Sequence, residues 1–435
     1  MSKDEKKKSR SPLAKEEAST KQPVVNVLDQ KQRKLFDLHG DRESVESTSE
    51  YPVMYKALHS EPRWQHPFNV YNDISTEPSA VEKTLALTDN STTTIAEEII
   101  SKDIKLVVNV GLPTSLFVGM NLANALVKYA SIQSWYIDSA EFIMQTSGNF
   151  PYDMEHTAFF MYSGSGSTYD TIEAARIVQE KAGYSVAFTS IAGSPITEKC
   201  SSSIVAAGGM DTGGSDTFHY ATRLASGLSL AFKLGKRLDP GKGDFDGMLA
   251  QLNDVPKIMR ERWDYWDGRS RSIGQRFCRK RAVIVVGGGA NVGSAEEMAL
   301  KFNEMASMPA HPMVPTRHLH GVFGLTDENI VTFIIAPPSP YEKWLHQVAE
   351  VTTILKAPAV AIVNDEETEI ADQVDYVVRI PSDNECIFSV LAVPILQLIP
   401  YYFAVADGTL NPDCQRSNIP KHARAWNRIF PPGSH

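Results

Sequence analysis

The sequence predicts an α/β protein with two parallel sheets, each covered by helices on both faces. Two observations carry this prediction. Short apolar runs that are typical of buried parallel strands alternate with amphipathic helical patterns. The order of strand, glycine-rich or hydroxyl-rich loop and helix in the first half then recurs in the second half, which indicates a duplicated domain. A chain of 435 residues has ample length for two such domains.

Composition divides the chain into six parts. The first is rich in charged residues and serine and holds few large apolar residues, so we expect a disordered or loosely packed arm. A helical lead-in precedes the first α/β domain, and a polar, charged linker precedes the second. The predicted parts are the arm at 1–50, the lead-in at 51–104, domain 1 at 105–235, the linker at 236–280, domain 2 at 281–405 and the tail at 406–435.

The strands are predicted where apolar runs of strand length end at loops. In domain 1 these runs are 106–110, 135–137, 157–162, 184–189 and 203–206, and in domain 2 they are 282–286, 331–336, 359–363 and 376–380. Helical patterns fill the intervals at 116–126, from 170 onward, 214–234, 295–306 and 391–403, whereas 140–142 is expected to be a loop. Such alternation implies right-handed βαβ units.

Charge and cysteine content exclude several classes of protein. The formal net charge of −9 argues against nucleic-acid binding, so an anion would need a local site. The four cysteines are scattered without paired spacing, which predicts free thiols in a reducing compartment and no metal site. We find no apolar run of about 18 residues and no apolar stretch behind the charged N-terminus. We therefore expect a cytoplasmic protein that is not bound to a membrane.

The most informative stretch is the hydroxyl loop, residues 163–168, which reads Ser-Gly-Ser-Gly-Ser-Thr. It follows the apolar run at 157–162, and an amphipathic helical pattern begins at Asp170. Backbone N–H groups at a helix N-terminus, together with three hydroxyls, suit a phosphate group. The loop lacks the lysine and the spacing of a nucleotide P-loop. From the residues alone, an ordinary strand-to-helix turn and a phosphate site remain equal alternatives.

The glycines at 287, 288, 289 and 293 raise the alternative of a dinucleotide site. Their spacing is one residue longer than the dinucleotide fingerprint requires. The strand at 331–336 ends in Ile335-Ala336-Pro337 and provides no acidic residue for a ribose. We therefore expect no nucleotide and no other cofactor.

The hydroxyl loop resembles the S-x-S-G-x-T phosphate loop of the sugar isomerase (SIS) domain. Over roughly residues 75–425 the chain resembles the isomerase half of glucosamine-6-phosphate synthase and the deglycases of phosphorylated fructosamines. Further matches are Thr114-Ser115 to a G-T-S loop, Ala140-Glu141-Phe142 to S-E-F, and Gly214–Arg223 to a G-T-E…A-S-T-K segment. The resemblance implies two tandem SIS domains, each a flavodoxin-like doubly wound sheet.

The same resemblance supplies candidate site residues. It implies that Ser163, Gly164, Ser165, Thr168 and Ser115 bind a sugar phosphate. The second repeat has Ile335-Ala336-Pro337-Pro338 in place of such a loop, so one phosphate site is expected per chain.

The catalytic candidates lie in the second half. Leu300-Lys301-Phe302-Asn303-Glu304 matches an L-K-L-K-E helix, and His320 stands 16 residues beyond Glu304, as the family's catalytic histidine does. A carboxylate suits proton transfer between C1 and C2, and an imidazole suits ring opening. Lys421, in a tail that the resemblance places over the active site, would stabilise enolate-like charge, and Lys301 would orient Glu304. By resemblance His320 acts in the neighbouring subunit of a homodimer.

These residues predict an enzyme that acts on a 6-phosphorylated, amino-substituted sugar. The chain starts with Met1-Ser2 and a charged tail where the synthase carries a glutaminase, so we expect a deglycase that releases a sugar 6-phosphate and a free amine. An aminosugar-6-phosphate deaminase or ketose–aldose isomerase is the close alternative. A non-catalytic regulator that senses sugar phosphates is the alternative from another class.

Overall fold

The structure is a computed structural model that describes residues 63–147, 149–209, 211–413 and Ala425. The predicted arm at 1–50, the first part of the lead-in and most of the tail at 406–435, including Lys421, lie outside the described residues.

The first sheet has five parallel strands in the order β2-β1-β3-β4-β5. This is the flavodoxin-like order of a doubly wound sheet. Its central strand β3 reads Thr-Ala-Phe-Phe-Met-Tyr and is buried along its whole length, as a parallel strand covered on both faces must be. The strands are β1 (Leu106–Gly111), β2 (Gln133–Asp138), β3 (Thr157–Tyr162), β4 (Tyr184–Thr189) and β5 (Ser202–Val205).

The second sheet repeats this topology. Its order β10-β9-β8-β6-β7 is the first sheet's order read from the other edge, and all of its strand pairs are parallel. The strands are β6 (Ala282–Val286), β7 (Ala310–Met313), β8 (Ile330–Ala336), β9 (Ala359–Asn364) and β10 (Tyr376–Ile380). The duplicated, doubly wound α/β fold predicted from the sequence is confirmed.

The other regular elements of the described chain are helices. The α-helices are α4 (Asn69–Ser75), α5 (Glu77–Ser101), α6 (Ser115–Ala125), α7 (Ser139–Thr146), α8 (Tyr169–Glu180), α9 (Pro195–Lys199), α10 (Thr217–Leu238), α11 (Phe245–Phe277), α12 (Val292–Ala306), α13 (Pro315–Leu319), α14 (Glu342–Leu355), α15 (Glu385–Leu391) and α16 (Val393–Asp407). Short η segments lie at Leu126–Ala130, Pro240–Lys242, Gly289–Asn291, Val322–Leu325 and Ala371–Gln373.

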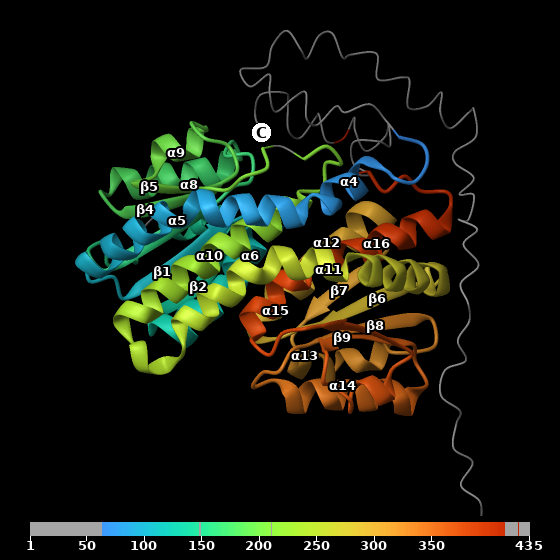
Figure 1. The fold of residues 1–435 in the computed structure, drawn as a ribbon. Coiled ribbons are helices and arrows are strands. Elements are labelled where there is room, and N and C mark those ends of the chain that lie inside the picture. Colours follow the sequence, from blue (N-terminus) through green and yellow to red (C-terminus); the bar gives the residue numbers. More distant parts are fainter. Residues whose placement is uncertain (1–62, 148, 210, 414–424, 426–435) are drawn as a thin grey trace, which may run out of the picture.

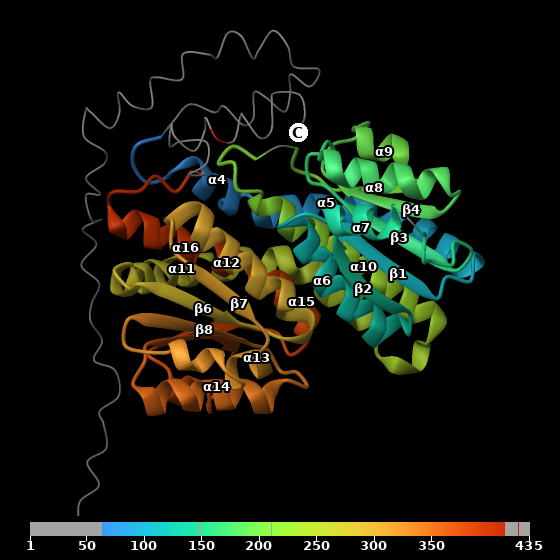
Figure 2. The ribbon, with the colours of Figure 1, turned by 180° about the vertical axis from the view of Figure 1, so that it is seen from behind.

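The two sheets enclose a shared layer of helices (Figures 1 and 2). Helices α7 and α8 cover the outer face of the first sheet, and α13 and α14 lie along the outer face of the second. Between the sheets lie α5, α6, α10, α11, α12, α15 and α16. Lys301 and Glu304, which lie on α12, therefore reach the first domain through this inner layer.

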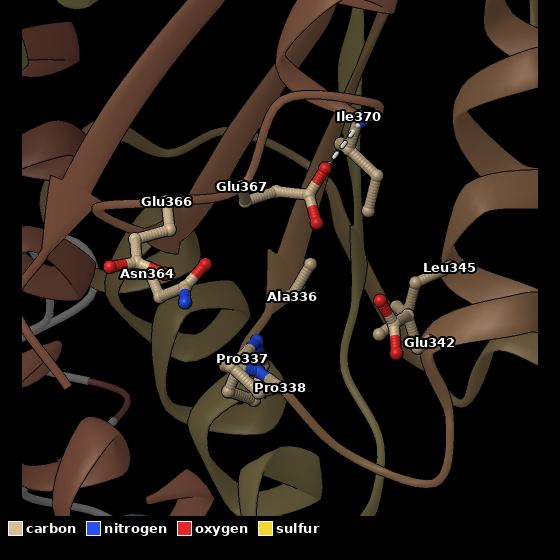
Figure 3. A pocket seen from close by; sticks show the side chains of 9 residues that line it. All are labelled: Ala336, Pro337, Pro338, Glu342, Leu345, Asn364, Glu366, Glu367 and Ile370. Carbon is tan, nitrogen blue, oxygen red and sulfur yellow. Dashed lines mark hydrogen bonds between the residues drawn. The ribbon is translucent and has the colours of Figure 1, made fainter. Parts of the chain in front are cut away.

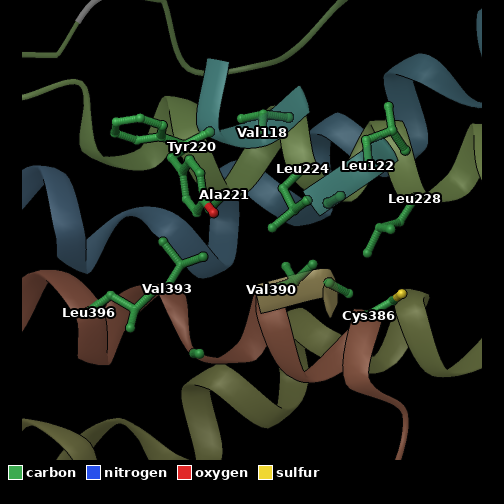
Figure 4. Packing of buried hydrophobic residues seen from close by; sticks show 14 of the residues in the cluster. Val118, Leu122, Tyr220, Ala221, Leu224, Leu228, Cys386, Val390, Val393 and Leu396 are labelled. Carbon is green, nitrogen blue, oxygen red and sulfur yellow. The ribbon is translucent and has the colours of Figure 1, made fainter. Parts of the chain in front are cut away.

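The inner layer holds one continuous apolar core. Figure 4 shows Leu122 of α6 and Leu224 of α10 from the first half facing Val390 of α15 and Val393 of α16 from the second. All four side chains are fully buried. Burying an aliphatic side chain stabilises the fold by about 1.5–3 kcal/mol. This core fixes the two domains against each other.

One local prediction is wrong, one strand was not predicted, and the predicted linker contains a long helix. The loop expected at 140–142 is the start of α7, whose first turn is capped by the Asp138 carboxylate accepting from the Ala140 N–H at 2.8 Å. Strand β7 was not predicted, because its sequence Ala-His-Pro-Met carries a proline and a polar side chain on an edge of the sheet. The segment at 236–280 contains the 33-residue helix α11, whose buried face packs on α16 and α5.

One apolar stretch is longer than the sequence analysis expected. Among the described residues, Glu385–Asp407 (α15 and α16) is long and apolar enough to cross a membrane, with a mean hydropathy of 1.8. Its most apolar window is entirely buried within the protein, where α16 packs against α11 and α12. Core helices meet the same length and composition criteria, and this stretch is such a core helix.

Candidate active site

The candidate site lies at the carboxyl edge of the first sheet, where β1 and β3 are neighbours. Gly111 at the end of β1 is paired with Tyr162 at the end of β3. The strand order reverses between these two strands, and doubly wound sheets bind ligands at such a point. The loop that leads to α6 and the hydroxyl loop that leads to α8 both begin here.

The hydroxyl loop is held in a defined shape by its own hydrogen bonds. The Ser163 and Thr168 hydroxyls are 2.9 Å apart, and the Ser167 hydroxyl donates to the Ser165 hydroxyl at 3.0 Å. The Gly166 N–H donates to the Ser163 carbonyl at 3.1 Å, and Gly166 has a φ of +69°. A side chain at Gly166 would also collide with Ser194, so the turn requires glycine.

This geometry brings the predicted phosphate ligands together. Ser163, Gly164, Ser165 and Thr168 lie in one turn at the N-terminus of α8, a 12-residue helix whose first turn starts after Thr168. Ser165 and Thr168 are half-buried, so part of each side chain reaches the surface. Hydroxyls beside a helix N-terminus form a site suited to an anion.

Ser115 is tied to the hydroxyl loop through a buried arginine. It is the first residue of α6, and its hydroxyl accepts a hydrogen bond from Nη1 of Arg223. Nη2 of the same guanidinium donates to Oδ2 of Asp216 at 2.8 Å. A Cβ added at Gly164 would lie 2.7 Å from Oδ1 of Asp216 and 3.3 Å from Nη2 of Arg223. The arginine and the aspartate therefore stand directly behind the loop.

Helix α12 of the second domain brings a charged row to the same corner. Glu297, Lys301 and Glu304 share one face of the helix, because their spacing is i, i+4 and i+7. Lys301 is fully buried, and its ammonium group lies 3.0 Å from Oε2 of Glu304 and 3.5 Å from Oε1 of Glu297. It also donates to the Thr114 hydroxyl at 3.1 Å and to the Ser215 carbonyl. Lys301 thus contacts Glu304 one helical turn away, and its predicted role of orienting Glu304 stays a prediction.

The electrostatics of this row differ between its members. Burial lowers the pKa of Lys301, but the carboxylates of Glu297 and Glu304 outweigh burial and raise it above its ordinary value. Burial raises the pKa of Glu297 to about 7 although Lys301 opposes the change. Lys301 is therefore a permanent cation at neutral pH, whereas Glu297 exchanges its proton near neutrality.

Two strained residues flank the site. Thr114 precedes α6 with a φ of +63°, and Asp216 precedes α10 with a φ of +53°. Residues other than glycine rarely adopt this left-handed conformation, and such strain gathers at functional sites. Both side chains are held by the contacts described above: the Thr114 hydroxyl donates to Oε2 of Glu297 at 3.1 Å, and Asp216 pairs with Arg223.

His320 lies apart from this cluster within one chain. It follows α13 and is exposed at a shallow groove that it shares with Trp344, Val351 and Ile354. Helix α13 packs on α14, across the second sheet from α12 and Glu304 (Figure 1). The structure brings Ser115, the hydroxyl loop, Lys301 and Glu304 to one corner and leaves His320 on the opposite face.

The corresponding corner of the second sheet is chemically different. There the ends of β8 and β9 border a cavity of about 200 Å³ that is lined by Pro337, Pro338 and the carboxylates of Glu342, Glu366 and Glu367 (Figure 3). Its acidic lining repels phosphate, which agrees with the prediction of one phosphate site per chain.

The same corner holds the one group of possible metal ligands found among the described residues. The ligand atoms of Glu342, His346 and Glu367 all lie within 4.8 Å of one another. Nδ1 of His346 is 3.0 Å from Oε2 of Glu369, so the imidazole already has a carboxylate partner. Glu342 is largely exposed, and exposed acidic groups are common without a metal.

Four residues of the hydrogen-bond network around Ser115 and Lys301 were not predicted to have a role. Arg223 and Asp216 were matched to a family segment but were given no role, and Thr114 and Glu297 were not singled out for one. The involvement of Glu297 could have been predicted from the sequence. Glu297, Lys301 and Glu304 are charged residues on one face of a mostly apolar helix, and buried charges have to be paired. The contact of Arg223 with Ser115 carried no signal, because it spans 108 residues.

The two doubly wound sheets and the hydroxyl loop are features that this chain shares with known sugar-phosphate proteins. Residues 277–407 match the family model of the SIS domain, so the second half of the chain contains an SIS domain. The C-terminal domain of glucosamine-fructose-6-phosphate aminotransferase from Francisella tularensis superimposes with a TM-score of 0.71 at 20% identity, covering 80% of this chain and 98% of that one. Tagatose-6-phosphate ketose/aldose isomerase from Escherichia coli gives 0.68 at 16% identity, covering 82% and 97%. The described chain therefore shares the fold of these structures, with two doubly wound domains in tandem.

Sequence relatives narrow the likeness further. Glutamine–fructose-6-phosphate aminotransferase (isomerizing) from Methanosarcina acetivorans is 28% identical over 254 residues, which cover 58% of this chain and 41% of the relative. The Pyrobaculum aerophilum protein of the same name is 26% identical over 359 residues, which cover 81% and 57%. The chain thus spans about half the length of the curated relatives it matches, and its predicted similarity to the synthase is confirmed.

Proposed function

We propose that this chain is an enzyme that moves a proton between C1 and C2 of a 6-phosphorylated, amino-substituted sugar. One observation carries the proposal: Glu304 is paired with the fully buried Lys301, which bonds to Thr114 beside the phosphate ligand Ser115. A base held next to a phosphate anchor is what this proton transfer needs. The names of the relatives, which include fructose 6-phosphate, support the same substrate class.

The described residues divide the chemistry between them. The hydroxyl loop and Ser115 hold the phosphate, which fixes the sugar chain relative to α12. Glu304 removes the proton from one of the two carbons and returns it to the other, since a carboxylate has the basicity for such a transfer. Lys301 keeps Glu304 oriented through their contact along one face of α12. Lys421, which lies outside the described residues, is the proposed partner of the enolate-like oxygen.

The preferred reaction is that of a deglycase. In a fructosamine 6-phosphate, loss of a proton from C1 and its return at C2 converts the ketosamine, through an enolamine, into an imine at C1. Water then adds at C1, the C1–N bond breaks, and an aldose 6-phosphate and the free amine leave. Atoms balance with water as the sole co-reactant, and no redox cofactor takes part. The alternatives remain an aminosugar-6-phosphate deaminase or isomerase and a regulator that binds without turnover.

We propose further that the active unit is a homodimer. His320 is exposed on the face of the second sheet opposite Glu304, so it would serve the site of a neighbouring subunit (Figure 1). The surface around it is suited to protein contact, because Trp344, Ile354 and Leu355 are exposed there. A ring-opening imidazole from the partner would complete each site.

The reaction class is tested by mass spectrometry of the protein incubated with fructosamine 6-phosphates and aminosugar 6-phosphates. Release of a free amino acid supports the deglycase, release of ammonia supports the deaminase, and binding without conversion supports the regulator. Glu304→Gln should abolish turnover while fructose 6-phosphate still binds, whereas Glu296→Gln on the same helix should remain active. Full activity of Glu304→Gln would remove the proposed base.

The shared site is tested by mixing two inactive variants. A dimer of Glu304→Gln with His320→Ala has one site with both native residues, so random exchange should restore about a quarter of the wild-type activity. Sedimentation must show dimers for this result to count. An active His320→Ala variant, or a mixture that stays inactive although the dimers exchange, would contradict the proposal.

A further inference from the structure

A buried histidine stands behind the hydroxyl loop and has no part in the mechanism above. His219 lies in the first turn of α10 and is 1% exposed. A Cβ added at Gly164 would lie 3.2 Å from its Nδ1, so the ring faces the loop's backbone directly. With Asp216 and Arg223 it forms what we call the charged triad.

The hydrogen-bond partners of the ring fix its charge. Nδ1 contacts Oδ1 of Asp216, and Nε2 lies 2.5 Å from the carbonyl oxygen of Gly209. A carbonyl oxygen can only accept, and the Asp216 carboxylate is ionised because Arg223 and His219 together overcome its burial and lower its pKa. Both ring nitrogens must therefore carry protons, which makes His219 an imidazolium.

The groups around His219 agree with this assignment. Burial lowers the pKa of His219, whereas the carboxylates of Asp216 and Asp211 raise it. Arg223 also lowers this pKa, and the net shift is upward. Asp211 precedes α10, and its carboxylate accepts from the N–H groups of Ser215 and Asp216 at 2.8 and 2.9 Å. The triad thus carries two positive charges and one negative charge behind a loop that lacks a lysine, and the Asp211 carboxylate adds one negative charge beside it.

We propose that His219 is a positioning residue that gives the hydroxyl loop its selectivity for a phosphate dianion. The loop binds the phosphate through hydroxyl and N–H groups, and the imidazolium behind Gly164 supplies the balancing charge. Its Nε2 also contacts the glycine-containing segment before α10 through the Gly209 carbonyl. This inference rests on the proposed function, since it names the feature by which the same site distinguishes phosphorylated from unphosphorylated sugars.

The experiment compares full-length wild-type protein with His219→Gln, which is neutral yet retains an amide donor. Calorimetric titration with fructose 6-phosphate, inorganic phosphate and fructose at pH 7 measures selectivity for the phosphate group. We expect His219→Gln to bind both phosphates at least about tenfold more weakly, with fructose binding unchanged. His311→Gln, which alters an exposed histidine of β7, should bind as the wild type does.

The outcomes separate the two proposals. If wild-type protein binds no phosphate ligand, the proposed function itself fails. If it binds and His219→Gln keeps the same preference for phosphate over fructose, only the role of His219 is refuted. Loss of thermal stability without loss of that preference refutes the same role, since it marks a purely structural residue.

A second measurement, made on wild-type protein, tests the proposal even if His219→Gln does not fold. Wild-type protein labelled with ¹⁵N at histidine should show one imidazole that stays protonated on both nitrogens at pH 8, well above the ordinary histidine pKa. Absence of any such imidazole would overturn the assignment of His219 as a cation.

Discussion

Glu297→Gln is the substitution whose effect on stability the structure specifies most fully. Glu297 is completely buried on α12, where Oε2 accepts from the Thr114 hydroxyl at 3.1 Å and Oε1 accepts from the Gln397 amide at 3.1 Å. Burial raises its pKa from the ordinary 4.5 to about 7. The folded protein therefore holds a proton on Glu297 over a pH range in which the unfolded chain has already released it.

The sign and size of the effect on the free energy of unfolding follow from the difference between the pKa of Glu297 in the folded and unfolded states. For an acid whose pKa is higher in the folded state, stability falls as the pH rises from the unfolded to the folded pKa. Each pH unit in this window costs about 1.4 kcal/mol, so Glu297 lowers the free energy of unfolding by about 3 kcal/mol between pH 4.5 and pH 7. Glutamine cannot ionise and avoids this loss, but it weakens one acceptor contact at a cost of about 1 kcal/mol.

We therefore expect Glu297→Gln to be about 1 kcal/mol less stable than wild type at pH 4 and about 2 kcal/mol more stable at pH 8. Urea unfolding followed by circular dichroism at several pH values measures both. The difference between the two proteins removes titrating groups that Glu297 does not influence. Glu77, whose pKa is raised by burial and by Glu297, adds to the difference. Glu328→Gln, at an exposed position, should follow the wild-type curve. Parallel curves for Glu297→Gln and wild type would refute the reasoning.

Two glycine substitutions test the close approaches that build the site. Gly164→Ala places a Cβ 2.7 Å from Oδ1 of Asp216, so calorimetry should show fructose 6-phosphate binding at least about tenfold more weakly; unchanged affinity would mean that the triad does not touch the loop. Gly293→Ala places a Cβ 2.0 Å from the Phe117 carbonyl of α6, and urea unfolding should show a loss of about 1–3 kcal/mol, whereas a neutral result would disprove this tight contact. Gly241→Ala, whose Cβ would meet nothing within 4 Å, should change neither quantity.

The fold was predictable because the spacing of apolar residues in the sequence matches the positions that are buried in the structure along most of the chain. The strand at Thr157–Tyr162 was predicted with its observed bounds, since an apolar run that stops at small hydroxyl residues has a clear end. Strand β7 was missed because an edge strand needs few apolar residues and tolerates Pro312. A helix was expected in the linker, but the length of α11 was not predicted, because the segment is highly charged and only a narrow face of its 33 residues is buried.

The site was predictable only in part. The hydroxyl loop and the Lys301–Glu304 pair are local patterns, so the sequence displays them directly. The link between Arg223 and Ser115 depends on how α10 packs against α6, which no local pattern encodes. The charge of His219 is likewise set by Asp216 and by the carbonyl of Gly209, a partner that carries no side chain. The sequence therefore identifies the candidate site residues, but the charge states of the buried groups depend on contacts between distant parts of the chain.

Duplication explains why the two halves must be held together so closely. Each sheet offers a ligand-binding corner, but only the first has hydroxyl groups and a cationic surround, while the second is lined by carboxylates (Figure 3). The second domain instead contributes α12, and Asn121 of α6 anchors that helix by accepting from the Gly293 N–H at 2.7 Å and donating to the Ser294 hydroxyl at 3.0 Å. These contacts hold α12, and with it Glu304, against the first domain. Under the proposed function, a small shift between the domains would separate the proposed base from the substrate, so the apolar core between the sheets would also support catalysis.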